Sequence, residues 1–147
     1  MRTTEGAVWI GRALIALVLV SNGQAAVRFL TQPEDYLAAY ELIGPAGEVA
    51  VRGFGLLFLM WNVPYAVALL HPLRFRVSLV EAIGMQALAV VGESLIRLSI
   101  PAEHAILRAS LLRFILFDSA GLAALLVAAW VSHGAWQRFR TQHSLVQ

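Results

Sequence analysis

The sequence contains no cysteine and no lysine, and charged residues make up only 14% of its 147 residues. The absence of cysteine excludes disulfide bonds, iron–sulfur clusters and thiolate zinc sites. The eleven basic residues are all arginine and are scattered along the chain without a nucleic-acid-binding motif, so we expect no nucleic-acid partner. The sequence also lacks a P-loop, a His-Glu-x-x-His motif and facing mid-span histidines, and it therefore predicts no metal and no certain cofactor.

Long apolar runs are what the sequence has instead. Hydrophobic residues make up 59% of the chain, and the mean hydropathy is +0.72. A soluble domain of this length could not bury so much apolar surface, so lipid is the expected solvent. Four segments reach the roughly 20 residues that a helix needs to cross a bilayer, and none alternates with a period of two. We predict an all-α fold, a single transmembrane domain over residues 1–147 in which four helices form a bundle, with spans at about 7–29, 48–70, 77–100 and 105–131 and a polar tail at 136–147.

The charges between the spans predict the orientation of the chain. The loop after the first span carries Glu34, Asp35 and Glu41 and no basic residue, whereas the next loop carries Arg74 and Arg76. Arginines also precede the first span and follow the last one. Because basic loops stay on the cytoplasmic side, we expect both termini to be cytoplasmic, and we place this multi-pass protein in the cytoplasmic (inner) membrane of a bacterium.

The loop between the first two spans carries a helix signal of its own. Over residues 31–45, Pro33 precedes two acidic residues and Gly44-Pro45 closes the segment. Proline and acids at the start and glycine at the end are typical of a short helix. Tyr36 and Tyr40 lie one turn apart on one face. We predict a short interfacial helix on the outer leaflet; the alternative is a lid over a site between the spans.

Several ionisable residues fall inside the predicted spans. A charge at the centre of a membrane helix costs about 2.5–3.5 kcal/mol on insertion scales, so such residues must pair, reach the surface or serve a site. At about 1.5 Å per residue, Arg52 lies roughly 7 Å, Glu93 roughly 10 Å and Arg113 roughly 12 Å from the outer ends of their spans. These three side chains can meet in one layer, with Gln86 and Asp118 nearer the middle of the membrane.

Polar residues on three spans also share faces, and the bundle interior is the least costly destination for them. At about 100° per residue, Gln86, Glu93 and Arg97 share a face of the third span. The other two stripes are Ser21, Gln24 and Arg28 on the first span and Glu48, Arg52, Gly55, Leu59 and Asn62 on the second. Arg113 and Asp118 lie about 140° apart on the fourth helix, so they need not share one pocket. The candidate ligand-binding residues are Arg52, Gln86, Glu93, Arg97, Arg113 and Asp118.

Three interpretations of these candidates stay open. The first is a buried ion network that fixes how the helices pack, because buried ion pairs often specify an arrangement more than they stabilise it. The second is a polar pocket in the outer half of the membrane for a ligand with a polar head and an apolar tail, such as a quinone, a lipid or an isoprenoid. The third is a proton or ion path, which Asp118 near the midplane indicates.

A second, smaller set of charges lies near the predicted cytoplasmic side. Arg12 and Glu81 each lie about 6 Å in from that face. We predict a structural ion pair between them, which would join the first and third spans.

Two stretches give the chain a resemblance to a known family. Residues 11–23 read Gly-Arg-Ala-Leu-Ile-Ala-Leu-Val-Leu-Val-Ser-Asn-Gly, and residues 52–59 read Arg-Gly-Phe-Gly-Leu-Leu-Phe-Leu. In these stretches and in its hydropathy plan the chain resembles the DoxX-like group of small four-helix membrane proteins. Such proteins often carry a lysine just after the glycine that ends the first stretch, where this chain has Gln24. The resemblance implies the fold and a link to quinone-related electron transfer or membrane redox complexes, and no catalytic residue is carried over.

The leading functional hypothesis is a non-catalytic accessory subunit of a larger membrane complex, such as an energy-transducing one. It would contact the lipid bilayer and other membrane protein subunits, and it would bind a lipid or a quinone. The alternative is a membrane oxidoreductase or isomerase acting on a quinone- or isoprenoid-like substrate, with Glu93 and Asp118 as acid–base groups and Arg52 and Arg113 holding charge. A second alternative is a proton- or anion-coupled carrier that depends on Asp118.

Overall fold

The computed structural model describes the backbone of residues 2–144 and the side chains of residues 5–133. Its regular elements are all helical: α1 (Arg2–Thr31), α2 (Glu34–Leu37), the short 3-10 helix η1 (Ala38–Tyr40), α3 (Gly44–Leu70), α4 (Arg76–Ser99) and α5 (Ala105–Ser144). Four of these helices are long and apolar enough to cross a membrane, over Glu5–Thr31, Gly44–Leu70, Arg76–Ser99 and Ala105–His133. The predicted all-α fold with four membrane-spanning helices is therefore confirmed at the level of the helices.

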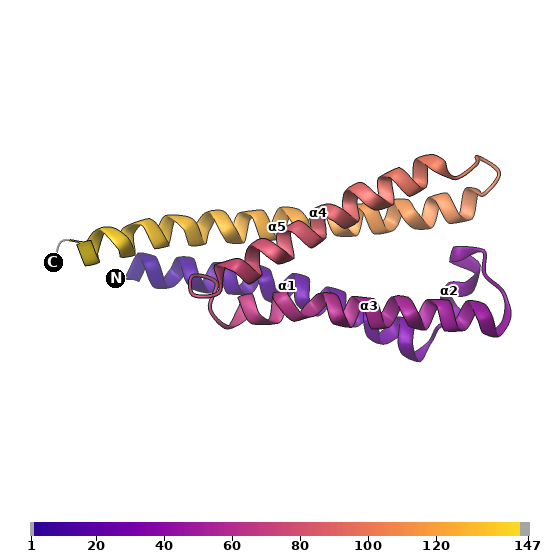
Figure 1. The fold of residues 1–147 in the computed structure, drawn as a ribbon, viewed down its shortest axis with the longest axis horizontal. Coiled ribbons are helices and arrows are strands. Elements are labelled where there is room, and N and C mark those ends of the chain that lie inside the picture. The colour runs from indigo at the N-terminus through magenta and orange to yellow at the C-terminus, as the bar shows by residue number, and fades with distance from the viewer. Residues whose placement is uncertain (1, 145–147) are drawn as a thin grey trace.

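The four long helices run alternately in opposite directions (Figure 1). Helix α1 packs against α3 and α5, and α4 packs against the same two helices, so α1 and α4 lie on a diagonal of the bundle, as do α3 and α5. Both ends of the chain lie at one end of the bundle, which we call the terminus end, and α2 lies at the other, the α2 end (Figure 1). This arrangement decides which of the predicted polar residues can meet.

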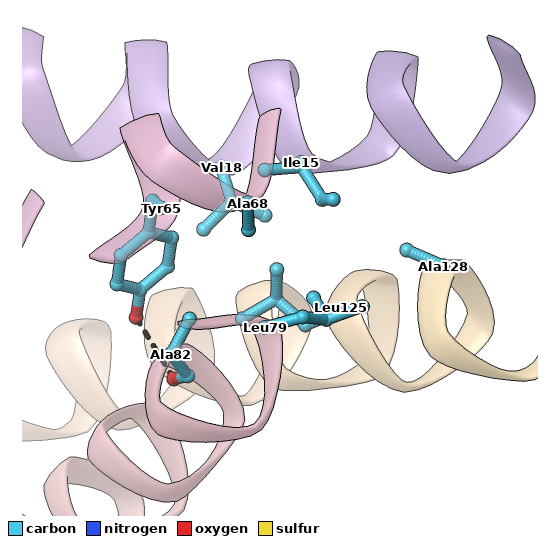
Figure 2. Packing of buried hydrophobic residues seen from close by; sticks show 8 residues of the cluster. All are labelled: Ile15, Val18, Tyr65, Ala68, Leu79, Ala82, Leu125 and Ala128. Carbon is cyan, nitrogen blue, oxygen red and sulfur yellow. Dashed lines mark hydrogen bonds between the residues drawn. The ribbon is translucent and has the colours of Figure 1, made fainter. Parts of the chain in front are cut away.

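The apolar core receives residues from all four long helices. Each contributes two members, and together they are Ile15, Val18, Tyr65, Ala68, Leu79, Ala82, Leu125 and Ala128 (Figure 2). Many larger apolar side chains point outward instead, including Leu88, which is 74% exposed, and Trp130, which is 77% exposed. An apolar exterior around a small core is the pattern that suits helices in lipid, since the lipid tails cover what water would not.

Helix α1 is held closest to α3 around Gly55. A Cβ atom placed on Gly55 would lie 2.9 Å from the backbone oxygen of Ala26 and 3.0 Å from Cβ of Phe29. Both of these α1 residues are buried, Ala26 completely and Phe29 to all but 1%. Because no side chain fits between the helices at this point, glycine is what allows the two backbones to approach.

The segment between α1 and α3 differs in its boundaries from the sequence prediction. The short helix is present as α2 and η1, but it ends at Glu41, whose backbone is left-handed with φ of 53°. Gly44 and Pro45, which we expected to close the short helix, instead begin α3, because a proline in the first turn favours a helix start. The position of this segment in a membrane interface stays a prediction.

The segment formed by α2 and η1, which we call the α2 segment, bridges the α2 end of the bundle, since α2 contacts α3 and η1 contacts α5. The ring of Phe29 on α1 contacts Tyr36 at 4.5 Å and Tyr40 at 6.4 Å between ring centres. On the other side, His104 pairs with the Glu41 carboxylate at 2.5 Å. The hydrogen bond that His104 donates to Glu41 raises the pKa of His104, and the same bond lowers the pKa of Glu41. We call this pair the Glu41–His104 clasp.

The last helix extends beyond the predicted fourth span. We expected the span to end near residue 131 and a polar tail to follow at 136–147, whereas the helical backbone of α5 continues to Ser144. The side chains after His133 lie outside the described residues.

Candidate functional site

A hydrogen-bonded group of four side chains, the polar core, lies where α3, α4 and α5 meet. Tyr65 donates from its hydroxyl to the Gln86 side-chain oxygen, and the Trp61 indole donates to the Tyr65 hydroxyl at 3.1 Å. Gln86 Nε2 donates to Asp118 Oδ1 at 2.8 Å and to the Asp118 backbone oxygen at 3.2 Å. Tyr65, Gln86 and Asp118 are at most 5% exposed. The polar core therefore crosses between three helices with most of its hydrogen-bonding capacity used.

Glu93 extends the polar core towards the α2 end. Its carboxyl group is close enough to Asp118 for the two to interact, and its Oε2 atom is buried without a hydrogen-bond partner. Its charge also acts on Tyr40 of η1, whose pKa is raised by burial first and by Glu93 second. Of the six candidate ligand-binding residues, Gln86, Glu93 and Asp118 are thus brought together.

Arg52 does not join Glu93 in this interior layer. Its side chain is 54% exposed and lies 3.8 Å from the carboxylate of Glu48, one turn earlier on α3. The neighbouring positions Val51 and Gly55 are the ones that face the core. The polar stripe of the second span is therefore divided: Gly55 and Asn62 are buried, whereas the charged members Glu48 and Arg52 pair with each other on the outside.

Arg97 has a structural role at the junction of α4 and α5. Its Nε donates to the backbone oxygen of Arg108 at 3.2 Å, and Arg108 Nη1 donates back to the Arg97 backbone oxygen at 3.3 Å. Arg108 also donates to the backbone oxygen of Ile100. These bonds satisfy carbonyl groups at the end of α4, which have no partner inside the helix.

The predicted ion pair between Arg12 and Glu81 does not form among the residues with described side chains. The Arg12 guanidinium lies over the Trp9 ring at 4.6 Å, and its Nε is buried without a hydrogen-bond partner. Glu81 is exposed and lines a depression beside Val63 and Pro64. The reason is topological: α1 and α4 lie on a diagonal of the bundle, so equal depth does not make these residues neighbours.

A second feature, which we call the α1/α5 groove, runs between the first and last helices in three adjoining sections. The section nearest the α2 end has a volume of about 250 Å³ and is lined by Ser21, Gln24, Ala25, Arg28, Phe29, Tyr36 and Phe114. The middle section, of about 200 Å³, is lined by Ala25, Arg113, Phe114 and Phe117. The section farthest from the α2 end, of about 210 Å³, is lined by Leu17, Val18, Ser21, Asn22, Phe117, Ala120, Gly121 and Ala124. Neighbouring sections share lining residues, so the three lie next to one another along the α1–α5 contact and are described together as one groove.

The chemistry of the groove changes along its length. Arg28, Gln24 and the Tyr36 ring stand at the α2 end, whereas the far end is mostly aliphatic. From Arg28 to Leu17 the groove follows α1 for roughly 16 Å at the helical rise. Asn22, only 3% exposed, lines the far section, and its Oδ1 atom has no hydrogen-bond partner. The groove thus offers a charged head region and a long apolar tail region.

The floor of the groove touches the polar core at Gly121. A Cβ atom on Gly121 would lie 2.8 Å from Gln86 Nε2 and 3.4 Å from Val18. The missing side chain therefore lets Gln86 reach Asp118 directly behind the far section of the groove. The groove and the polar core are adjacent, but neither Glu93 nor Asp118 is among the residues that line the groove.

Sequence reasoning identified part of this arrangement. It placed Ser21, Gln24 and Arg28 on one face of the first span, which is the wall of the groove. It missed Tyr65 at the centre of the polar core and Phe114, Phe117 and Gly121 in the groove, because apolar residues on a membrane helix resemble lipid-facing ones. A signal for Tyr65 was its position four residues after Trp61, which places the two side chains on one face.

No protein-family model, curated protein or solved structure matches the chain. The class of protein is therefore given by the fold alone, as a multi-pass protein with four helices able to cross a membrane. The resemblance to DoxX-like proteins stays a prediction.

Proposed function

We propose that the protein is a non-catalytic membrane subunit that binds one amphiphilic molecule, a lipid or a quinone, in the α1/α5 groove. The observation that carries the proposal is the row of three adjoining sections with arginines towards the α2 end and an aliphatic far end. A ligand with a polar head and an apolar tail matches this gradient in both chemistry and direction. The α2 segment, which places Tyr36 beside the head region, acts as the cover of the site.

The role as an accessory subunit is part of the same proposal. Between Arg2 and Ser144 short connections join the four long helices, and we propose that the protein works as part of a larger membrane assembly. We place the protein in a bacterial cytoplasmic membrane with its termini in the cytoplasm. The basic loop that contains Arg74 lies at the terminus end, which supports this orientation under the positive-inside rule.

The second candidate is a proton- or anion-coupled carrier, which one observation favours. Asp118 lies buried inside the bundle and interacts electrostatically with Glu93, and the polar core continues from Asp118 through Gln86 and Tyr65 to Trp61. Under this candidate, Asp118→Asn should abolish pH-driven flux in proteoliposomes, and unchanged flux would remove it. The enzyme alternative, with Glu93 and Asp118 as acid–base groups, is less supported because these carboxyls do not line the groove.

Native mass spectrometry of the gently extracted protein, with lipid and quinone extraction from the same sample, tests the proposal. We expect one amphiphile per protein, and a stoichiometric protein partner in the mildest detergent. Ala120→Phe should fill the far section of the groove and remove the amphiphile. Ala123→Phe is the matched control, because Ala123 is exposed on α5 and is not among the residues that line the groove. Absence of both amphiphile and partner from the wild type would refute the proposal. Equal retention of the amphiphile by the two variants would show that it binds outside the groove.

A further inference from the structure

Arg28 and Arg113 differ from other arginines of the membrane-spanning helices in what balances their charge. Arg52 has the Glu48 carboxylate, Arg97 and Arg108 exchange bonds with backbone carbonyls, and Arg12 lies over Trp9. Within the described part of the chain, Arg28 has no hydrogen bond or ion pair. Arg113 donates only to the neutral hydroxyl of Ser110, at 3.1 Å. Both guanidinium groups are exposed.

The two unbalanced charges line adjoining sections of the groove. Arg28 lines its first section and Arg113 lines its middle section, and both sections include Ala25 and Phe114. Arg113 lies eight residues into α5, which is roughly 12 Å below the helix start at the helical rise. An exposed cation at this depth in a bilayer is costly unless an anion meets it. Glu93, the carboxylate expected in this layer, forms no ion pair with Arg113 among the described side chains.

We propose that the amphiphile in the α1/α5 groove is an anionic phospholipid, whose phosphate is held between Arg28 and Arg113 while one acyl chain lies along the far section. This inference rests on the proposed function and chooses lipid over quinone. A quinone head is neutral, so its carbonyl oxygens can accept hydrogen bonds but leave the positive charge of both guanidinium groups unbalanced. Guanidinium groups match the geometry of phosphate oxygens and bind them through paired, charge-assisted hydrogen bonds. A zwitterionic head would bring its own cation towards the second arginine, so a net negative head is favoured.

The test compares three amphiphiles and one free anion on the purified full chain in a neutral detergent. Phosphatidylglycerol, phosphatidylcholine, a short-chain quinone and inorganic phosphate are titrated separately and followed by native mass spectrometry. We expect phosphatidylglycerol to bind at one per protein and at least about tenfold more tightly than phosphatidylcholine or the quinone. That factor corresponds to the loss of one charge-assisted hydrogen bond. Inorganic phosphate should neither bind at millimolar concentration nor displace the lipid, because it gains nothing from the apolar section.

Variants assign the preference to the two arginines. Arg113→Gln and Arg28→Gln should each weaken phosphatidylglycerol binding about tenfold and leave phosphatidylcholine binding unchanged. Arg52→Gln is the matched control, an exposed arginine in the same half of the bundle but outside the groove, and it should change neither lipid more than about twofold. Arg113→Lys keeps the charge without the planar fork and should lie between wild type and Arg113→Gln, which separates anion binding from misfolding.

Each outcome separates this inference from the proposed function. Equal binding of phosphatidylglycerol, phosphatidylcholine and quinone, all sensitive to Ala120→Phe, would overturn the anionic head and leave the groove as the site. Tighter binding of the quinone, or an effect of Arg52→Gln as large as that of Arg113→Gln, would also overturn it. Displacement of lipid by inorganic phosphate would show a phosphate site rather than a lipid site. Failure of every amphiphile to bind the wild type would refute the proposed function itself.

Discussion

From Leu17 to Phe29, the two sides of α1 are built in opposite ways. Towards α3, Gly55 admits the α1 backbone so closely that a Cβ atom would lie 2.9 Å from the Ala26 oxygen, and Phe29 is buried in the same interface. Towards α5, the same helix leaves a groove in which Arg28 is exposed and the buried Asn22 Oδ1 has no partner. One side is closed by small residues and the other is left open with polar groups available.

This difference separates packing from binding on a single helix. In a membrane, small residues drive close helix contact because lipid gives no hydrophobic reason for helices to associate. Polar groups on the closed side would need hydrogen-bond partners inside the helix interface. Polar groups on the open side can instead find their hydrogen-bond partners on a ligand. Substitutions on the closed side should therefore change stability, and substitutions on the open side should change binding.

The largest effect should come from closing the contact at Gly55. Gly55→Val places atoms where the Ala26 backbone lies, and overpacking of this kind costs about 2–3 kcal/mol of unfolding free energy. Reversible unfolding in mixed micelles measures it. Gly53→Val is the control, because nothing lies within 4 Å of a Cβ atom at Gly53, and it should stay within about 0.5 kcal/mol. Equal effects of the two substitutions would mean that the α1–α3 side is no tighter than the exterior of α3.

Asp118→Leu tests whether the polar core behind the groove contributes to stability, like the closed side, or to binding, like the open side. The substitution removes the side-chain acceptor of Gln86 Nε2, which keeps only the Asp118 backbone oxygen and so has one buried N–H unpaired, at a cost of about 2 kcal/mol. Asp118→Asn keeps an acceptor oxygen and should lose less than half as much stability. We expect lipid binding in the groove to survive both changes. Lost binding with unchanged stability would move the polar core into the binding site.

Tyr65→Phe gives a smaller version of the same test. It deletes a hydroxyl that donates to Gln86 and accepts from Trp61 Nε1, and interhelical hydrogen bonds of this kind contribute about 1 kcal/mol in membrane proteins. The same unfolding measurement applies. Tyr36→Phe is the control, since the Tyr36 hydroxyl lines the groove without a hydrogen bond within the described side chains. A larger loss of unfolding free energy for Tyr36→Phe than for Tyr65→Phe would contradict the assignment of the open side to binding and not to stability.

The smallest effect should be the pH dependence of the Glu41–His104 clasp, which holds the segment covering the open side. Because the pKa of His104 is raised, its contribution is present below the ordinary histidine value of about 6.5 and is lost as pH rises through the raised value. The pKa of Glu41 is lowered, so its contribution is present above about 4.3 and is lost as pH falls through the lowered value. The contribution of the pair to stability should therefore be largest between about pH 4.3 and pH 6.5. The maximum should be shallow, since the pair is exposed to solvent.

Hydrogen exchange of the backbone at Glu41 and Leu107 measures the clasp directly. Leu107 donates its backbone N–H to the Glu41 carboxylate at 3.4 Å, so its protection should fall as pH rises through the raised pKa of His104. His104→Gln should remove that pH dependence. Protection that rises with pH in the wild type would contradict the sign of the expected effect.

The long helices could be predicted well because the length of an apolar run is enough to identify a helix that can cross a membrane. The beginning of α3 was displaced by about four residues, since Gly44-Pro45 serves equally well as the end of one helix and the start of the next. The end of α5 was displaced further, because a helix continues beyond the residues that lipid requires.

The candidate site could be predicted only in part, because depth and helical angle do not say which helices are neighbours. They brought Gln86 and Asp118 to the interior, where the structure pairs them. They also put Arg52 in the interior, although its angle places it just outside the buried face. Arg12 and Glu81 match in depth, but they stand on diagonal helices. The groove was missed because its far wall is made of residues such as Phe117 that differ in no way from lipid-facing ones.

The groove lies between the first and the last of the four spans, so its two walls are synthesised at opposite ends of this chain. While the chain is being inserted, the wall carrying Arg28 enters the membrane long before the wall carrying Arg113 is translated. The site is therefore absent from every partly made chain and is assembled only when α5 comes to rest against α1. A molecule that occupies the groove would then report, by its presence, that the bundle is complete.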